Sequence, residues 1–197
     1  MCASAGKGAA VKMEMDHQPK GGLRRMTSAD LEMVLAWRNE PRVRNNMYSQ
    51  QEIALEDHRR WWAKTKISPH DRYFIYEVQK TPLGLVAFNE IDQTHETAFW
   101  GFYTSPDAPR GTGAGLGLAA LDYGFGELGL HKLCAEVLAY NAASLKFHRK
   151  LGFVEEGVLV AHKKINGAFV DVHRLAAFAV SWGEKRLELM KRLSERV

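Results

Sequence analysis

The sequence predicts an α+β fold with α/β/α layers, in which a single domain forms around one mixed central sheet. The chain has 197 residues, 46% of them hydrophobic and 25% charged, which is typical of one globular domain. The hydrophobic period changes repeatedly between helical and strand spacing. Three consecutive strand patterns lie close enough to pair antiparallel, whereas the next strand follows a helical crossover and is therefore expected to pair parallel.

The chain is expected to divide into a disordered tail at 1–22, the main domain at 23–182 and a C-terminal amphipathic helix at 183–197. The tail is small, polar and glycine-containing, so it buries too little apolar surface to fold. It shows no apolar stretch typical of a secretory signal, and no run of 18 apolar residues predicts a membrane span. The two cysteines have neither disulfide nor metal-ligand spacing, so we expect a cytoplasmic protein without a metal.

The first third of the domain is expected to form a short strand and two helices. Thr27, Ser28 and Asp30 are residue types that cap helices, and apolar residues at helical spacing follow them. Pro41 then ends the first helix. The expected bounds are 23–26 for the strand, 31–39 and about 54–66 for the helices, and 42–48 for an irregular basic segment between them.

The middle of the chain is expected to form an antiparallel meander of three strands, at 72–79, 83–90 and 97–104. Their β-branched and aromatic residues are typical of strands. We expect Thr81-Pro82 to make the first turn and the polar segment 92–96 to make the second.

The last part is expected to alternate helices with strands and to close with a hairpin. Asn166-Gly167 is a strong signal for a two-residue hairpin turn. The expected bounds are a helix from the Pro/Gly-rich stretch 105–117 to about residue 128, a strand at 132–141, a helix at 143–151, strands at about 154–163 and 170–180, and a charged amphipathic helix at 183–196.

The formal net charge is +4, with the basic excess at the two ends of the chain. No stripe of basic residues alternates with aromatic residues, so a nucleic-acid-binding function has no motif support. A small polyanionic ligand such as a nucleotide fits the charge equally well.

A glycine-rich loop after the meander is the most informative segment, and it reads Arg110-Gly111-Thr112-Gly113-Ala114-Gly115. Glycines let successive backbone N–H groups face one concavity, and the N-terminus of the following helix adds positive potential. The loop therefore predicts a cradle for a phosphate or pyrophosphate. It lacks the Lys-Ser/Thr ending of a Walker loop and does not follow the first strand of a parallel unit, as a dinucleotide loop does.

About 30 residues further on, Asn141 ends a strand and Leu151-Gly152-Phe153 ends a short helix. With Arg110-x-x-Gly113-x-Gly115, these residues resemble the GNAT superfamily of N-acetyltransferases over about residues 23–180. The resemblance implies a GNAT-type mixed sheet with splayed fourth and fifth strands, and acetyl-CoA as co-substrate. The spacing from Pro106 to Arg110 is one residue longer than usual. The CoA-binding residues that the resemblance implies are Phe102, Tyr103, Thr104, Arg110, Gly111, Thr112, Gly113, Ala114, Gly115, Asn141 and Ser144.

The resemblance also implies catalytic groups. In the superfamily a Tyr, four residues before the glycine of the Gly-Phe pair, usually acts as general acid, and here that position holds His148. A neutral imidazole can donate a hydrogen bond to the leaving thiol, and the alternative is a surface histidine without a role. Glu136 and Glu90 are the candidate bases. Glu136 lies mid-strand, where a carboxylate needs a partner or a function, and it could instead brace the acceptor loop.

The N-terminal third resembles the nucleotide-sugar N-acetyltransferases of pseudaminic acid biosynthesis, a pathway of flagellin glycosylation. The shared patterns are Arg-Asn, Val-Arg and Met-Tyr within 38–48, His-x-x-Trp at 58–61 and Gly-Phe-Tyr-x-x-Pro at 101–106. The resemblance implies acetylation of the 4-amino group of a UDP-linked 4-amino-4,6-dideoxy sugar by direct attack. Arginines would bind the diphosphate, and aromatic residues would pack against the sugar methyl group. The expected acceptor-binding residues are Arg38, Arg42, Arg44, Met47, Tyr48, Trp61 and Tyr103.

Other interpretations stay open at this stage. Trp61 could only pack its helix on the sheet, and the arginines could form a solvated face. The enzyme could act on a peptide N-terminus or on a small amine or amino acid. The chain could also be a CoA-binding or nucleic-acid-binding module without catalysis. We expect a UDP-amino-sugar substrate and neither nucleic acid nor a membrane as partner, and the sequence leaves open whether the chain forms a homodimer.

Overall fold

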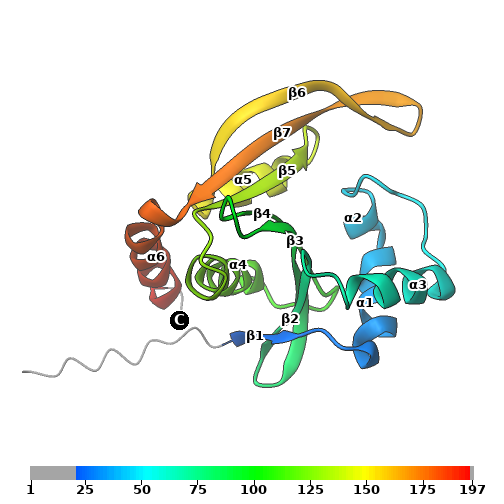
Figure 1. Cartoon of the computed structure of the whole chain (residues 1–197), viewed down its shortest axis with the longest axis horizontal. Coiled ribbons are helices and arrows are strands. Elements are labelled where there is room, and N and C mark those ends of the chain that lie inside the picture. The colour runs from blue at the N-terminus through cyan, green and yellow to red at the C-terminus, as the bar shows by residue number, and fades with distance from the viewer. Residues whose placement is uncertain (1–20, 196–197) are drawn as a thin grey trace, which may run out of the picture.

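A seven-stranded mixed sheet forms the centre of the protein in a computed structural model that describes residues 21–195 (Figure 1). Its order is β1-β2-β3-β4-β5-β7-β6, and neighbouring strands pair antiparallel except for β4 and β5, which pair parallel. The α+β class, the meander and the parallel crossover predicted from the sequence are confirmed. The strands are β1 (Gly21–Arg25), β2 (Arg72–Val78), β3 (Thr81–Asp92), β4 (Thr97–Thr104), β5 (Lys132–Leu138), β6 (Val154–Ile165) and β7 (Ala168–Phe178).

Helices cover both faces of this sheet. They are α1 (Leu31–Asn39), α2 (Pro41–Arg44), α3 (Leu55–Thr65), α4 (Thr112–Asp122), α5 (Ala142–Lys150) and α6 (Ala179–Ser194). On one face, Val34 of α1 and Trp62 of α3 pack with Ile75 of β2. On the other, residues of α4, α5 and α6 pack with its neighbour Phe74, because successive strand residues point to opposite faces. Within residues 21–195, no helix is long and apolar enough to span a membrane.

Two of the hairpin turns differ in how well the sequence predicted them. Asn166 and Gly167 make the turn between β6 and β7, with φ values of 49° and 88°, as expected. The turn between β2 and β3 is made by Gln79 and Lys80, with φ values of 50° and 65°, and not by Thr81-Pro82. Pro82 lies inside β3 at a register shift, a place where its missing N–H is tolerated.

Both ends of the domain differ from the expected bounds. Gly21 and Gly22 belong to β1 and not to a tail, and residues 1–20 lie outside the described residues. Helix α6 begins at Ala179, four residues before the expected start. Trp182 and Leu189, seven residues apart, share the buried face of this helix. The Trp182 indole donates to Asp122 Oδ1 at 2.9 Å, so tertiary packing extends the helix into sequence that resembles a strand. Helix α4 ends earlier than expected, at Asp122, and one π-helical turn follows it.

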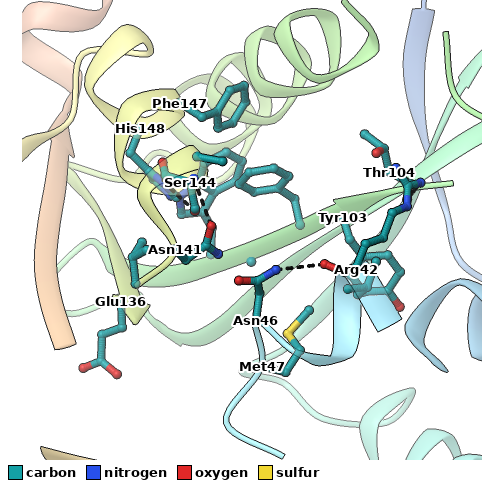
Figure 2. Close-up of a pocket in the computed structure, with 16 residues that line it drawn as sticks. Arg42, Asn46, Met47, Tyr103, Thr104, Glu136, Asn141, Ser144, Phe147 and His148 are labelled. Atoms are coloured by element: carbon teal, nitrogen blue, oxygen red, sulfur yellow. Dashed lines mark hydrogen bonds between the residues drawn. The ribbon is translucent and has the colours of Figure 1, made fainter. Parts of the chain in front are cut away.

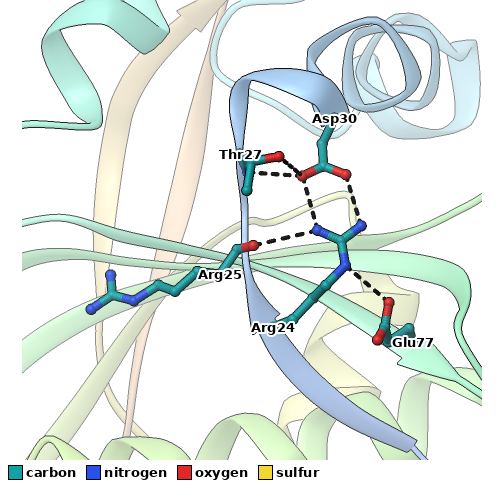
Figure 3. Close-up of polar contacts among 5 residues, drawn as sticks. All are labelled: Arg24, Arg25, Thr27, Asp30 and Glu77. Atoms are coloured by element: carbon teal, nitrogen blue, oxygen red, sulfur yellow. Dashed lines mark hydrogen bonds and ion pairs between the residues drawn. The ribbon is translucent and has the colours of Figure 1, made fainter.

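An ionic clamp joins β1 to the start of α1 and to β2 (Figure 3). The Arg24 guanidinium donates to both carboxylate oxygens of Asp30, at 2.7 and 2.9 Å, and to Glu77 at 2.9 Å. Asp30 also accepts from the backbone N–H and hydroxyl of Thr27, at 2.8 and 2.9 Å. The hydrogen bonds from Arg24 lower the pKa of the buried Asp30 carboxyl below its usual 3.8.

Replacing Asp30 by Asn is expected to lower the free energy of unfolding by about 1–3 kcal/mol at pH 7, because Arg24 loses a charged acceptor. Since the native pKa of Asp30 lies below the unfolded value, its contribution is present above about pH 3.8 and disappears as the pH falls through the native pKa. Urea unfolding of both proteins at pH 7 and at successively lower pH measures this difference. The matched control is Asp57→Asn, since Asp57 pairs with Arg60 on an exposed helix surface and should cost less than about 1 kcal/mol. An equal decrease in the free energy of unfolding in the two variants would contradict a stabilising role for the clamp.

Candidate active site

The parallel pairing of β4 with β5 stops after three residue pairs, the last of which joins Phe99 to Cys134. Strand β4 continues along β3 to Thr104, and β5 continues along β7 to Leu138. A cavity of about 400 Å³, which we name the transfer cavity, opens between the separated strands (Figure 2). The predicted splay of the fourth and fifth strands is therefore confirmed.

The transfer cavity has two sides, which we name after the helices that form them. The α5 side consists of Asn141, Ala143, Ser144, Phe147 and His148, and the α2 side of Arg42, Val43, Asn46 and Met47. Residues 100–104 of β4 line it in between, with Glu136 and Val137 of β5. Val137 belongs to the core beneath α4 and α5, so its neighbour Glu136 lies on the opposite face of the sheet. The cavity therefore reaches both faces of the sheet.

Asn141 explains why α5 begins at the edge of the cavity. Its side-chain oxygen accepts a hydrogen bond from the backbone N–H of Ser144 at 3.1 Å, which is the interaction of an N-cap. Ser144 and His148 follow at a spacing of four residues and share one face of the helix. The cap thus directs both side chains toward the transfer cavity.

His148 lies in an aromatic enclosure and is 4% exposed. Its ring is edge-on to Trp100 and Phe153, with centroids 5.5 and 4.9 Å away. Its Nδ1 lies 2.8 Å from the carbonyl oxygen of Ser144, and because a carbonyl only accepts, Nδ1 carries the proton. Burial lowers the pKa of His148 below its usual 6.5, so the ring is neutral at pH 7. Nε2 is then a hydrogen-bond acceptor, whereas the sequence led us to expect that a neutral His148 donates a hydrogen bond to the leaving thiol.

The glycine-rich loop forms the N-terminus of α4, next to the α5 side. Gly111 caps the helix with φ of 96°, a conformation that favours glycine. A Cβ at Gly113 would meet Phe147 at 3.5 Å, an ordinary contact, whereas a Cβ at Gly115 would lie 2.4 Å from Tyr76 Oη. A side chain at Gly113 would therefore meet only an ordinary contact, whereas Gly115 is also needed for packing against Tyr76. The arrangement fits the pyrophosphate of acetyl-CoA, with Arg110 exposed beside it.

Glu136 is bound on two sides by other residues. It accepts from Tyr48 Oη at 2.6 Å, and the Arg174 guanidinium also donates to it. Burial by itself raises the pKa of Glu136, but the hydrogen bonds from Tyr48 and Arg174 outweigh it, so the pKa lies below its usual range. Glu136 is therefore ionised at neutral pH. Its bond to Tyr48 also makes it a brace of the segment 45–54 between α2 and α3.

The predicted acceptor residues are spread over two cavities. Met47 and Tyr103 line the transfer cavity, together with Arg42, which donates to the carbonyl oxygens of Thr104 and Ser105. Arg44 and Tyr48 line a second cavity of about 570 Å³, between segment 45–54 and the β6–β7 turn.

Three of the predicted acceptor-binding and catalytic residues line neither cavity, and neither do the predicted loop residues 110–115. The guanidinium of Arg38 donates to the carbonyl oxygen of Ser49 at 2.7 Å. Trp61 stacks on His58, with ring centroids 4.8 Å apart, and meets the edge of Tyr73, so it packs α3 on the sheet. Glu90 is exposed, with φ of 53° at an irregularity of β3. The structure therefore does not bring Glu90 to the site as a base.

Several lining residues were not singled out from the sequence, among them Asn46, Trp100 and Phe147. Strand alternation could have identified Trp100, because it lies two residues before Phe102 on the same face. The three-residue spacing from the predicted Ser144 could have identified Phe147. No local signal points to Asn46, whose side chain donates to the carbonyl of Arg42 at 2.8 Å.

Five buried side-chain nitrogens lack a hydrogen-bond partner within residues 21–195: Arg38 Nη1, Arg44 Nε, His58 Nε2, Trp100 Nε1 and Arg174 Nε. Trp100 lines the transfer cavity and Arg44 the second one. Arg174 contacts Glu136, and burial lowers the pKa of both Arg38 and His58. Three of the five are guanidinium N–H groups, which only a hydrogen-bond acceptor can satisfy. Within the same residues, no group of three or more His, Cys, Asp or Glu could hold a metal ion.

Residues 22–154 match the family model described as an acetyltransferase (GNAT) domain. The chain belongs to the GNAT acetyltransferase family. This membership confirms the fold and the acetyltransferase class predicted from the sequence, with acetyl-CoA as the acetyl donor of the family. A similar solved structure is the spermidine N-acetyltransferase from Vibrio cholerae in complex with CoA and spermine. It has a TM-score of 0.78 and 28% sequence identity, covering 84% of this chain and 99% of that chain.

Curated relatives of this GNAT protein include a spermidine N(1)-acetyltransferase and the acetyltransferase PseH. The spermidine N(1)-acetyltransferase of Vibrio cholerae is 36% identical over 105 residues, which cover 53% of this chain and 61% of the relative. The acetyltransferase PseH of Campylobacter jejuni is 27% identical over 128 residues, covering 65% of this chain and 79% of that protein. The sequence match to the spermidine enzyme is thus higher in identity but spans about three fifths of its length, whereas the structural match covers 99% of that chain.

Replacing Gly113 by Val is expected to weaken CoA binding at least tenfold, because a side chain on the first turn of α4 obstructs the approach of the pyrophosphate. The melting temperature should stay close to that of the wild type, since the Cβ meets only Phe147 at an ordinary distance. Titration calorimetry with CoA measures the affinity. Gly126→Val is the matched control, since nothing lies within 4 Å of its Cβ and it lies outside the loop. Unchanged CoA affinity in a folded Gly113→Val protein would refute the cradle.

Proposed function

We propose that this GNAT protein transfers the acetyl group of acetyl-CoA to a primary amine of a small molecule. The observation that carries the proposal is the transfer cavity, which passes through the split between β4 and β5 and connects the α5 side with the α2 side. Such a passage lets the donor and the acceptor approach from opposite faces and meet at the split. Its size lies within the range of small-molecule sites.

The acetyl donor is proposed to bind along α4, α5 and β4. The N-terminus of α4, with its positive potential, is proposed to face its pyrophosphate, with Arg110 beside it. Phe102, Tyr103 and Thr104 lie on the part of β4 that β5 has left, and Asn141 and Ser144 close the site at α5. When bound, acetyl-CoA supplies an acetyl thioester.

Glu136 and His148 are the proposed catalytic pair. The ionised Glu136 lies between the two sides, on the sheet face opposite α5, and attracts the ammonium form of an acceptor, although its lowered pKa makes it a weak base. The neutral His148 on the α5 side has a lone pair on Nε2. It can accept the proton that the amine loses, and the resulting imidazolium can release it again, because burial keeps its pKa low.

Two acceptor classes follow from different observations. The spermidine enzymes among the relatives favour a polyamine. The charge around the α2 side favours an anion, since six cations and one carboxylate, Glu136, line the two cavities or form side-chain contacts with their lining residues. The cations are Arg38, Arg42, Arg44, Lys163, Lys164 and Arg174.

A polyamine suits this surface poorly for two physical reasons. A polycation is repelled by a basic surface, and its ammonium groups only donate hydrogen bonds, so they leave the buried guanidinium N–H groups unpaired. A nucleotide-linked amino sugar offers phosphate and hydroxyl acceptors as well as one amine. We therefore propose a UDP-linked 4-amino-4,6-dideoxy sugar as the acceptor, in line with the sequence patterns at 38–48, 58–61 and 101–106 that resemble nucleotide-sugar N-acetyltransferases.

The proposal predicts that a UDP-4-amino-4,6-dideoxy sugar is acetylated with a kcat/KM at least 100-fold above that of spermidine. Thiol release from acetyl-CoA across both compounds, a free amino acid and a peptide measures this ratio. Preference for spermidine would support the polyamine enzyme instead and would overturn the charge argument. CoA binding without turnover on any amine would leave only a binding module.

A second prediction concerns His148. Replacing it by Phe keeps the aromatic packing but removes Nε2, so we expect kcat to fall about 100-fold or more while the melting temperature stays nearly unchanged. In the wild type, kcat should hold from pH 8 to about 6.5 and fall at lower pH, where Nε2 becomes protonated. His148→Ala should in addition lower the melting temperature, because it leaves a void beside Trp100 and Phe153. Normal kcat in a folded His148→Phe enzyme would reduce His148 to a packing residue.

A further inference from the structure

The second cavity lies beside the α2 side and has walls from two distant parts of the chain. One wall is segment 45–54 with the end of α2, and the other is the β6–β7 turn, which arches toward it (Figure 1). Its volume of about 570 Å³ can hold a substantial part of a ligand. It is lined by Arg44, Asn45, Tyr48, Ser49, Gln50, Gln51, Lys164, Ile165 and Asn166, nearly all of them polar.

Hydrogen bonds hold the two walls together. Asn166 Nδ2 donates to Gln50 Oε1 at 3.0 Å, across 116 residues of sequence. Gln50 Nε2 in turn donates to the carbonyl oxygen of Asn45 at 2.6 Å and to Tyr140 Oη at 2.7 Å. Tyr140 Oη donates to that same carbonyl at 2.9 Å. The positive φ values of Asn166 and Gly167 aim the turn at this contact, so the cavity is preformed.

The cationic groups of this cavity lack anionic partners. Arg44 and Lys164 line it, and neither forms an ion pair within residues 21–195. Arg44 Nε is also buried without any hydrogen-bond partner. Lys163 adds positive charge nearby, with Nζ 4.6 Å from the ring centroid of Tyr48. A guanidinium with a dry, unpaired N–H beside a lysine is the donor set that binds a phosphate.

Tyr48 connects the second cavity to the transfer cavity. It lines the second cavity, and its hydroxyl donates to Glu136, which lines the transfer cavity. A ligand with an anionic group near Arg44 and Lys164 can therefore extend past Tyr48 and present an amine beside Glu136. We infer that the second cavity binds the phosphate or diphosphate group of the acceptor, which rests on the proposed function and adds a binding site for the acceptor's anionic end.

The test compares UDP, pyrophosphate and uridine as probes of the full chain with CoA bound, by titration calorimetry. The double variant Arg44→Met/Lys164→Met removes both cations and keeps side-chain length. It should lower the affinity for UDP and for pyrophosphate at least tenfold and leave the affinity for uridine unchanged. Wild-type affinity for CoA in the variant confirms that the fold is intact.

Lys191→Met on exposed α6 is the matched control, because it removes a positive charge far along the chain from both cavities. The inference is overturned if UDP binds the double variant as it binds the wild type, if UDP does not bind the wild type, or if the control loses as much affinity as the double variant. It is also overturned if the double variant loses as much affinity for uridine as it loses for UDP. Failure of the proposed function is seen separately, as turnover of spermidine in place of nucleotide sugars.

Discussion

After Phe99 the hydrogen-bond ladder between β4 and β5 ends, and the candidate site forms around that break. Buried backbone N–H and C=O groups that are not paired between strands need other hydrogen-bond partners. Arg42 bonds the carbonyl oxygens of Thr104 and Ser105 near the open end, and the remaining free edge of β4 faces the transfer cavity. The break therefore creates both the passage through the sheet and the backbone surface along which an acetyl donor can lie.

Several residues around this break both stabilise the fold and contribute to the candidate site. Asn141 caps α5 and also lines the cavity, so the same hydrogen bond that starts the helix positions His148. Gly115 belongs to the predicted phosphate loop, yet Tyr76 occupies the space that its side chain would need. The bond from His148 Nδ1 to Ser144 selects the tautomer. Because each group is held by its neighbours, little reorganisation is needed when substrates bind.

The charge of the two cavities and the sequence identity to relatives favour different acceptors at this site. The spermidine enzymes share more identity with the chain, whereas the cavities carry an excess of cations, among them Arg44, whose buried Nε has no hydrogen-bond partner within residues 21–195. In the proposed function, the acceptor preference depends on side chains of α2, segment 45–54 and the β6–β7 turn, because they line the second cavity.

Local sequence signals were enough to predict most helices and strands and the residues proposed to bind acetyl-CoA. Capping residues, turn dipeptides and hydrophobic periods act over a few residues, so α1, β4 and the Asn166-Gly167 turn were predicted where they occur. The glycine-rich loop, Asn141 and Leu151-Gly152-Phe153 were recognised from the sequence as resembling the GNAT superfamily. That resemblance implied the splay of the fourth and fifth strands.

Only the tertiary structure showed which residues form the proposed acceptor-binding cavities and which protonation states Glu136 and His148 adopt. Tyr48 meets Glu136 across 88 residues, and Asn166 meets Gln50 across 116, and no local period encodes such contacts. Sequence patterns also placed Trp61 and Glu90 at the site, although packing on Tyr73 and an irregularity in β3 direct them elsewhere. The pKa values of Glu136 and His148 depend on burial and on partners from other elements. Only the folded chain brings these groups together, because their interactions extend over a few ångströms in space and not along the sequence.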